Sequence, residues 1–387
     1  MVPVAVTNPP PGAMKMVEAN DDLSKCPKET RVNTNGPSKK RSKLITSLLV
    51  TTLTVGSLIT LPPPSAQADA HDPVEHQVLM LAADIEAISD ALFVDGAVSV
   101  ASSRDAGSAS APMRVYISEL EAEASSLRAA GGVTVLDTTA EIMIEDSQTE
   151  PGVVQGYLHV TRTVAELPQG ELWEEMIPIT LTSTPEGELR VNHVEVSPVA
   201  SLNAAELAER TTTPSLEEGA ASIDLSGPAA PRPQAINATK VVNYAKKWWN
   251  GRNRDYPTKY KNDCTNFASQ AMHQGGWKTV SGFYRSDKAW WYNALNTSYS
   301  WGGAENFYRF AVNESKRAKT LRYVKDLWLG DILQYKSKGA TNMSHTMIVT
   351  NWINKVPYLT YHTRDTLNKP FTAIKHLDVT WFALNVL

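Results

Sequence analysis

The stretch that decides the fold reads YKNDCTNFASQAMHQGG and covers residues 260–276. Asp263 is a residue type that favours the N-cap of a helix, and the two glycines at 275 and 276 favour a helix end. Between them lies an apolar stripe that would hold the helix against a sheet. It consists of Phe267, Ala268, Ala271 and Met272. The sequence therefore predicts a short helix that begins at Cys264 and packs on a sheet.

Cys264 holds the position in this helix that best suits a nucleophile. A helix N-terminus carries unpaired N–H groups and a partial positive charge, which favour a thiolate over a thiol. The N–H of Cys264 could also donate to a developing oxyanion. A cysteine that packs under the helix as an inert apolar residue is the alternative. The chain's other cysteine, Cys26, lies near the amino terminus.

A thiol nucleophile needs a histidine base, and residues 237–387 contain four histidines. His273 lies nine residues along the same helix, which is about 13 Å by helical rise and too distant. His345 begins an apolar run expected to be a buried strand, after another expected strand at 330–335. His362 ends the next expected strand and could orient the ring of His345. The fourth is His376.

These motifs together resemble the putative amidase domain family of secreted bacterial proteins, which is related to the NlpC-type and CHAP cysteine peptidases. The matching segments are 263–270, 275–276, 330–331, 344–345 and 361–363. The resemblance covers about residues 237–387. It implies an α+β, papain-like domain whose nucleophile helix packs on an antiparallel sheet.

The resemblance also implies roles for individual residues. Cys264 would be the nucleophile, His345 the general base and then acid, and His362 the residue that orients the imidazole. Asn351 is a rival for this third role, and Asp365 a weaker one. The implied reaction is amide hydrolysis through a thioester, without metal or cofactor. A zinc site formed by Cys264 and the histidines is an alternative, but it lacks a closely spaced ligand pair.

Charge divides the chain into two parts. Residues 69–236 hold 7 Lys+Arg against 28 Asp+Glu, a net of −21, whereas residues 237–387 hold 22 against 9, a net of +13. The positive charge predicts an anionic partner such as peptidoglycan or another cell-wall polymer. Nucleic acid is not expected, because no binding motif accompanies the charge. The acidic part could also dock on the basic part and cover its cleft.

The remaining regions are predicted from pattern and composition. Residues 1–68 have the layout of a signal peptide cleaved after Ala68, which makes the protein secreted; an uncleaved membrane anchor is the alternative. Residues 69–199 predict a small acidic α+β accessory domain with helices at 73–92 and 113–129. Its strands are expected at 133–145, 153–164, 173–183 and 188–196, with a hairpin turn at 185–187. Residues 200–236 read as a disordered linker.

Aromatic residues give the candidates for substrate contact. Nine of the ten tryptophans lie in residues 237–387. Trp290, Trp291 and Trp301, together with Asp263, are the candidate substrate-binding residues, although core packing is the ordinary role of such tryptophans. The predicted function is a secreted cysteine amidohydrolase that acts on peptidoglycan peptides. The alternative is a catalytically silent wall-binding or adhesion protein that retains the fold.

Overall fold

The computed structural model describes residues 73–100, 109–145, 152–185, 187–196, 219–226, 236–257 and 262–387. The predicted signal peptide and most of the predicted linker lie outside these residues. We call residues 73–196 the acidic half and residues 219–387 the basic half. No described helix combines the length and the apolar character needed to cross a bilayer.

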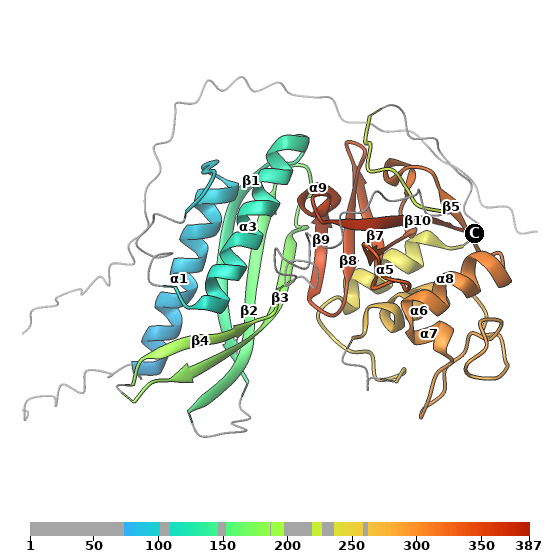
Figure 1. Cartoon of the computed structure of the whole chain (residues 1–387), viewed down its shortest axis with the longest axis horizontal. Coiled ribbons are helices and arrows are strands. Elements are labelled where there is room, and N and C mark those ends of the chain that lie inside the picture. Colours follow the sequence, from blue (N-terminus) through green and yellow to red (C-terminus); the bar gives the residue numbers. More distant parts are fainter. Residues whose placement is uncertain are drawn as a thin grey trace, which may run out of the picture. The chain divides into compact units, whose positions relative to one another are not determined.

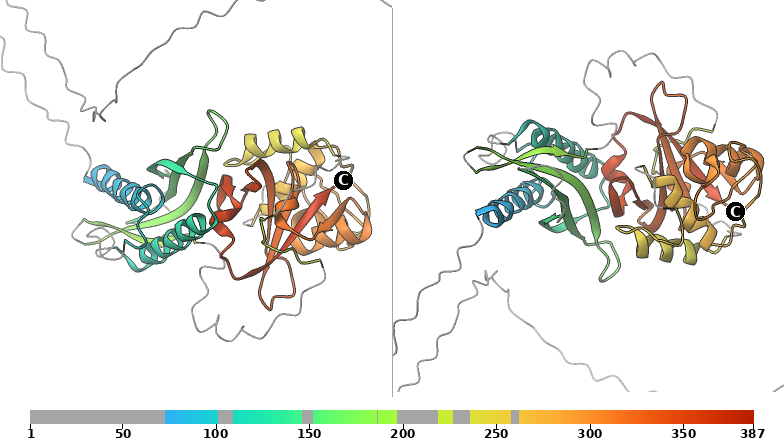
Figure 2. Two further views of the ribbon diagram at one scale, coloured as in Figure 1. Left: turned by 90° about the horizontal axis from the view of Figure 1, so that it is seen from above. Right: turned by 90° about the horizontal axis from the view of Figure 1, so that it is seen from below.

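The acidic half has two helices on one face of a four-stranded meander (Figures 1 and 2). Helix α3 begins where Ser110 accepts a hydrogen bond from the N–H of Met113, and it ends at Gly131, whose φ is 66°. The elements confirm the helices and strands expected from periodicity. Their bounds are α1 Pro73–Phe93, α3 Ala111–Ala130, β1 Val135–Ile144, β2 Val153–Val164, β3 Trp173–Ser183 and β4 Leu189–Val194.

Alternation along β2 and β3 explains the core of this half. Every second residue of each strand faces the helices, so that Leu158, Val160, Ile177 and Ile179 are buried against them. The other face of the two strands is mostly polar, although Met176 and Pro178 also lie on it. The acidic half therefore builds a core with α1 and α3, as its sequence pattern predicts.

The basic half packs helices on one side of a second set of strands. Helix α5 begins where the side chain of Asn237 accepts from the N–H of Lys240 at 3.0 Å. Helix α6 begins at Cys264 as predicted and lies against strand β7. The bounds are α5 Ala238–Trp248, α6 Cys264–Gln274, α7 Tyr299–Gly302, α8 Ala304–Tyr308, a π-helix Arg309–Glu314, β5 Ala318–Leu321, a 3₁₀ turn Val324–Asp326, β6 Ile332–Ser337, β7 His345–Ile353, β8 Val356–Tyr361, β9 Asp365–Pro370, α9 Phe371–Ile374 and β10 Val379–Val386.

One antiparallel sheet of ten strands runs through both halves. Its order is β1-β2-β3-β9-β8-β7-β6-β10-β5, and β4 pairs with β3 beside this path. The halves meet where β3 pairs with β9 over three residue pairs, with Glu175 opposite Thr366 at the centre. The sequence predicts two separate domains. The described strands instead form one continuous sheet, and the fold that contains it is of the α+β class.

Part of the predicted linker has regular contacts with the basic half. The N–H of Ala221 donates to the carbonyl of Trp381, and the N–H of Ser222 donates to that of Arg322, both at 2.8 Å. Ala221 and Leu225 also pack on the core beneath. The prediction of a disordered linker is therefore wrong for residues 219–226. Amino-acid composition could not reveal these contacts, because they are backbone hydrogen bonds to residues far away in the chain.

Candidate active site

Helix α6 presents Cys264 at its first position and is held firmly from three sides. The predicted apolar stripe is fully buried. At the far end of the helix a side chain on Gly275 would lie 2.5 Å from Val241, so glycine is needed for α5 to approach. Two indole N–H groups hold the polar side of the helix, from Trp301 to Asn266 at 2.7 Å and from Trp290 to Ser269 at 3.2 Å.

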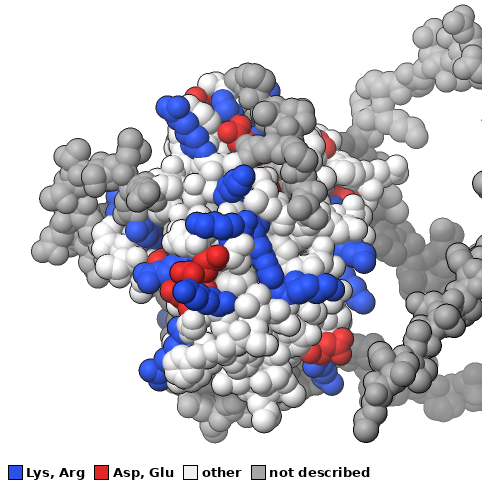
Figure 3. Space-filling model, turned by 90° about the vertical axis from the view of Figure 1, so that its right-hand side faces the viewer, with Lys and Arg blue, Asp and Glu red and all other residues white. Residues whose placement is uncertain are grey.

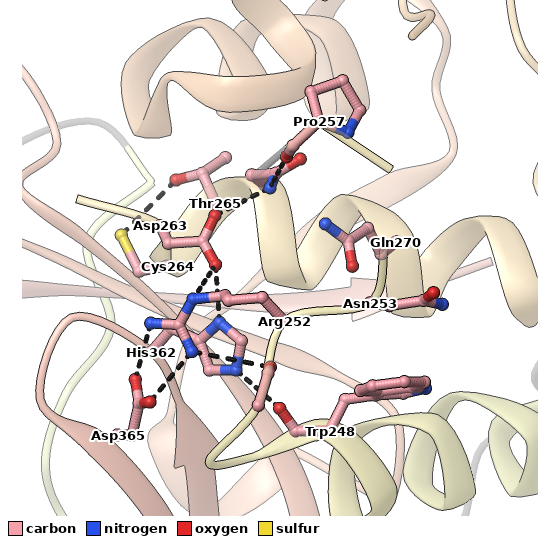
Figure 4. A network of polar contacts seen from close by, with 12 residues as sticks. Trp248, Arg252, Asn253, Pro257, Asp263, Cys264, Thr265, Gln270, His362 and Asp365 are labelled. Atoms are coloured by element: carbon pink, nitrogen blue, oxygen red, sulfur yellow. Dashed lines mark hydrogen bonds and ion pairs between the residues drawn. The ribbon is translucent and has the colours of Figure 1, made fainter. Parts of the chain in front are cut away.

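Asp263 is a buried carboxylate that anchors the start of α6. It occupies the N-cap position, but its side chain makes no capping bond to the helix backbone. It accepts instead from the ring of His362 at 2.7 Å, from Arg252 at 2.9 Å and from the amide of Asn266 at 2.7 Å (Figure 4). With 1% of its surface exposed, Asp263 cannot contact a substrate in this structure, contrary to prediction.

His362 is enclosed by acceptors on both sides (Figure 4). Its Nδ1 faces Asp263, and its Nε2 lies 2.7 Å from the carbonyl oxygen of Trp248. A carboxylate and a carbonyl only accept, so the ring makes both bonds when it carries a proton on each nitrogen. The ring also stacks on Phe267 at a centroid distance of 3.8 Å. Both nitrogens therefore bind groups other than His345, the partner that the sequence predicted.

His345 is the first residue of β7, and its ring lies in a buried aromatic setting. The ring contacts Tyr361 edge to face at 4.9 Å and lies 5.4 Å from Tyr335. Burial lowers the pKa of His345 to about 4. The ring is thus neutral at physiological pH, which is the form that can accept a proton.

Cys264 and His345 are linked indirectly, through a hydrogen bond between the residues that follow them in the chain. The hydroxyl of Thr265 is hydrogen-bonded to that of Thr346 at 2.9 Å, which ties the residue after the cysteine to the residue after the histidine. Because side chains alternate along a strand, the ring of His345 lies on the face opposite Thr346. Cys264 and His345 are therefore adjacent through the backbone but are not hydrogen-bonded to each other.

The thiol is buried and protonated in this arrangement. Burial raises the pKa of Cys264, although the Thr265 hydroxyl, the backbone N–H of Thr346 and the Thr363 hydroxyl oppose the shift. The direction is opposite to the lowering predicted for a helix N-terminus, because the loss of hydration on burial is the largest influence on this pKa. The resting site combines a neutral thiol with a neutral imidazole.

Other predicted residues lie away from the sulfur. Asn351 is six residues along β7 from His345, about 20 Å for a strand, and it donates to Glu171 and Asn368. Asp365 pairs with Arg252. Trp290 and Trp301 are fully buried and cannot line a groove, whereas Trp291 is partly exposed and its indole donates to Gly282.

Two further residues lie near the cysteine: Arg252, which had no signal in the sequence, and Thr363, which the sequence placed in a matching segment without a role. Arg252 bridges Asp263 and Asp365, residues that are far apart in the chain. Thr363 has a φ of 94°, which is rare for a β-branched residue and indicates local strain beside the sulfur. Among the described residues, no group of three His, Cys, Asp or Glu side chains could hold a metal ion.

The site thus places a buried cysteine at the start of α6, beside strand β7, which begins with His345. Residues 235–384 match the family model described as "Putative amidase domain", which agrees with the resemblance seen in the motifs and indicates an amide hydrolase.

Two curated relatives from Bacillus subtilis (strain 168) are similar to part of the chain. "Uncharacterized protein YhbB" is 34% identical over 111 residues, which are 28% of this chain and 35% of the relative. "Uncharacterized protein YjcM" is 28% identical over 137 residues, 34% of this chain and 31% of the relative. This chain thus spans about a third of each relative. No solved structure matches it.

Replacing His345 with glutamine is expected to make the fold less sensitive to acid. Between the native pKa of about 4 and the ordinary value of 6.5, the unfolded chain binds the proton and the native state does not. His345 therefore lowers the wild-type free energy of unfolding by about 2–3 kcal/mol as the pH drops from above 6.5 to about 4.5. The variant lacks the titrating ring, so its free energy of unfolding is expected to fall less over the same pH range. Urea unfolding at the two pH values measures the difference.

The control for this experiment is the exposed His193, replaced in the same way. His193→Gln is expected to keep the wild-type dependence on pH. If His345→Gln also keeps it, His345 is not a buried neutral ring.

Proposed function

We propose that the basic half is a cysteine amidohydrolase with a papain-like core of the NlpC and CHAP kind, in which Cys264 is the nucleophile and His345 the base. The thiol proton passes to His345 as the sulfur bonds to the amide carbon. His345 then returns this proton to the leaving amine as the carbon–nitrogen bond breaks. Water attacks the resulting thioester, gives a proton to His345 and releases the acid, while the thiol regains its proton.

The observation that carries this proposal is the contact between the start of α6 and the start of β7. The bond between Thr265 and Thr346 fixes the backbone next to both reacting residues. The first N–H groups of α6 point beyond the helix end, where an oxyanion could develop next to the sulfur. Turnover requires the ring of His345 and the sulfur of Cys264 to reach hydrogen-bond distance, so the start of β7 must rearrange when the substrate binds.

The contacts of His362 support a role different from the one that the resemblance implies. His362 holds Asp263, and Asp263 is the residue directly before the nucleophile. We therefore assign His362 as a positioning residue for the start of α6. Asn351 lies too far along β7 to orient His345.

Charge and the expected export support a cell-wall substrate. Lys and Arg side chains are spread over the face of the basic half shown in Figure 3, where Asp and Glu are fewer. Exposed cations of this half include Lys278, Arg285, Lys288, Lys316 and Lys319. Such a surface attracts an anionic wall polymer. We propose peptidoglycan stem peptides as the substrate and a secreted, wall-associated location.

Mass spectrometry of purified peptidoglycan after incubation with the protein tests this proposal. The expected result is a new pair of termini at one type of amide bond, formed by the wild type and not by Cys264→Ser. Binding to the wall without any new termini would favour the silent wall-binding protein instead.

A further inference from the structure

We propose that the acidic half is a cover over the Cys264–His345 site, held closed by buried ion pairs, and that substrate enters only when this cover opens. The inference rests on the function proposed above. It goes beyond it because it assigns the acidic half a task in the same reaction.

The first observation is that the acidic half forms one wall of the space beside His345. His345 lines a cavity of about 40 Å³, which has room for water but not for a peptide. From the acidic half, Glu119 and Glu123 of α3 and the residues at 195–196 line the same cavity. Cys264 and His345 are both more than 90% buried. Thr363, whose hydroxyl lies near the sulfur of Cys264, lines this cavity as well. The acidic half therefore closes the side of the site that His345 and Thr363 line.

The second observation is a cluster of charges buried between the halves. Arg364 binds Glu119 at 2.8 Å and Glu175 at 3.1 Å. Lys369 binds Glu175 at 3.2 Å and also contacts Glu123. Arg162 completes the cluster by binding Glu175 at 3.0 Å. Three carboxylates thus face three cations, and the basic half supplies only Arg364 and Lys369.

The third observation is that the cluster touches the segment that borders the nucleophile. Arg364 directly follows Thr363, whose hydroxyl lies beside the sulfur of Cys264. Thr363 in turn follows His362, which holds Asp263. The same three-residue turn, 362–364, therefore carries the anchor of α6, a neighbour of the sulfur and an anchor of the cover.

The contact between the halves is of a kind that can open. Only three residue pairs join β3 to β9. Separating the buried ion pairs costs less than their attraction alone, because the charges regain their hydration when the halves part. At the rim, Lys246 binds Glu171 at 2.6 Å, and both side chains keep about a quarter of their surface exposed. Opening is opposed by a buried apolar core that both halves share, in which Leu127 and Trp173 of the acidic half belong to the same cluster as Phe371 of the basic half.

The rate at which iodoacetamide alkylates Cys264 measures opening without any need for a substrate. Glu171→Lys places a cation opposite Lys246 and is expected to speed alkylation about 5- to 10-fold, since a rim pair is worth about 1 kcal/mol. Adding Lys246→Glu restores an ion pair of reversed polarity and is expected to bring the rate back toward wild type. Glu123→Lys, in the buried cluster, is expected to increase the rate about 100-fold or more.

Glu188→Lys is the matched control, because Glu188 is exposed on the β3–β4 hairpin and the change in charge is the same. It is expected to leave the alkylation rate unchanged. Hydrogen exchange separates opening from unfolding: opening raises exchange in α3, α9 and β9 but leaves β2 protected. Since Glu171 lies at the rim, its variant stays informative if Glu123→Lys does not fold.

Each outcome decides the inference. The inference is overturned if wild-type Cys264 is alkylated as fast as a free cysteine. It is also overturned if Glu171→Lys and Glu188→Lys give equal alkylation rates. Faster alkylation that Lys246→Glu reverses supports it. If this pattern appears while no variant hydrolyses an amide, the cover stands and the proposed hydrolase function fails.

Discussion

Cys264→Ser is expected to abolish amide hydrolysis, with a loss of about 10³-fold or more in turnover. The serine hydroxyl is far less acidic than a thiol and is a much weaker nucleophile, so the same imidazole base yields far less reactive oxyanion than thiolate. The side chain keeps nearly the same shape, so packing under α6 is preserved. Release of amine from a cell-wall peptide, measured for both proteins, gives the ratio.

Cys26→Ser is the matched control, because Cys26 is the only other cysteine of the sequence. It is expected to hydrolyse at the wild-type rate. Equal turnover by Cys264→Ser and wild type would remove Cys264 from the reaction.

Glu175→Gln is expected to lower the free energy of unfolding by about 3–5 kcal/mol. Burial alone would raise the pKa of Glu175, but Lys369, Arg364 and Arg162 hold it below its usual value. Removing this charge leaves three cations facing two carboxylates in a space without exposure to water. Urea unfolding near neutral pH, followed by tryptophan fluorescence, measures the loss.

The neighbouring Glu174 provides the control for this prediction. It lies on the other face of β3, is partly exposed and binds His159 at 2.8 Å. Glu174→Gln is expected to change the free energy of unfolding by about 1 kcal/mol or less. If the two variants lose the same amount, the buried cluster does not stabilise the contact between the halves.

The elements of secondary structure could be predicted well from the sequence. Strands β2 and β3 have the bounds expected from alternation, and α6 begins at the predicted Cys264. Such predictions succeed because local periodicity and capping preferences depend on neighbouring residues alone. The helix, its apolar stripe and the strand that starts at His345 were therefore accessible without a structure.

The contacts between distant segments could not be predicted. Asp263 looks like a helix cap in sequence, but its side chain turns to Arg252 and His362, whose proximity depends on the whole sheet. The pairing of β3 with β9 likewise joins residues that are 189 to 193 positions apart in the chain. A net charge of −21 does not reveal which three glutamates become buried.

The buried charges also limit how the two halves can be recombined. A chain that joined this C-terminal half to an unrelated amino-terminal module would leave Arg364 and Lys369 without counterions, unless the new module offered acids at the same places. Apolar replacements at both positions would lift that restriction. Modular exchange among related proteins should therefore change these two positions together, and grafted chimeras that ignore them should express poorly.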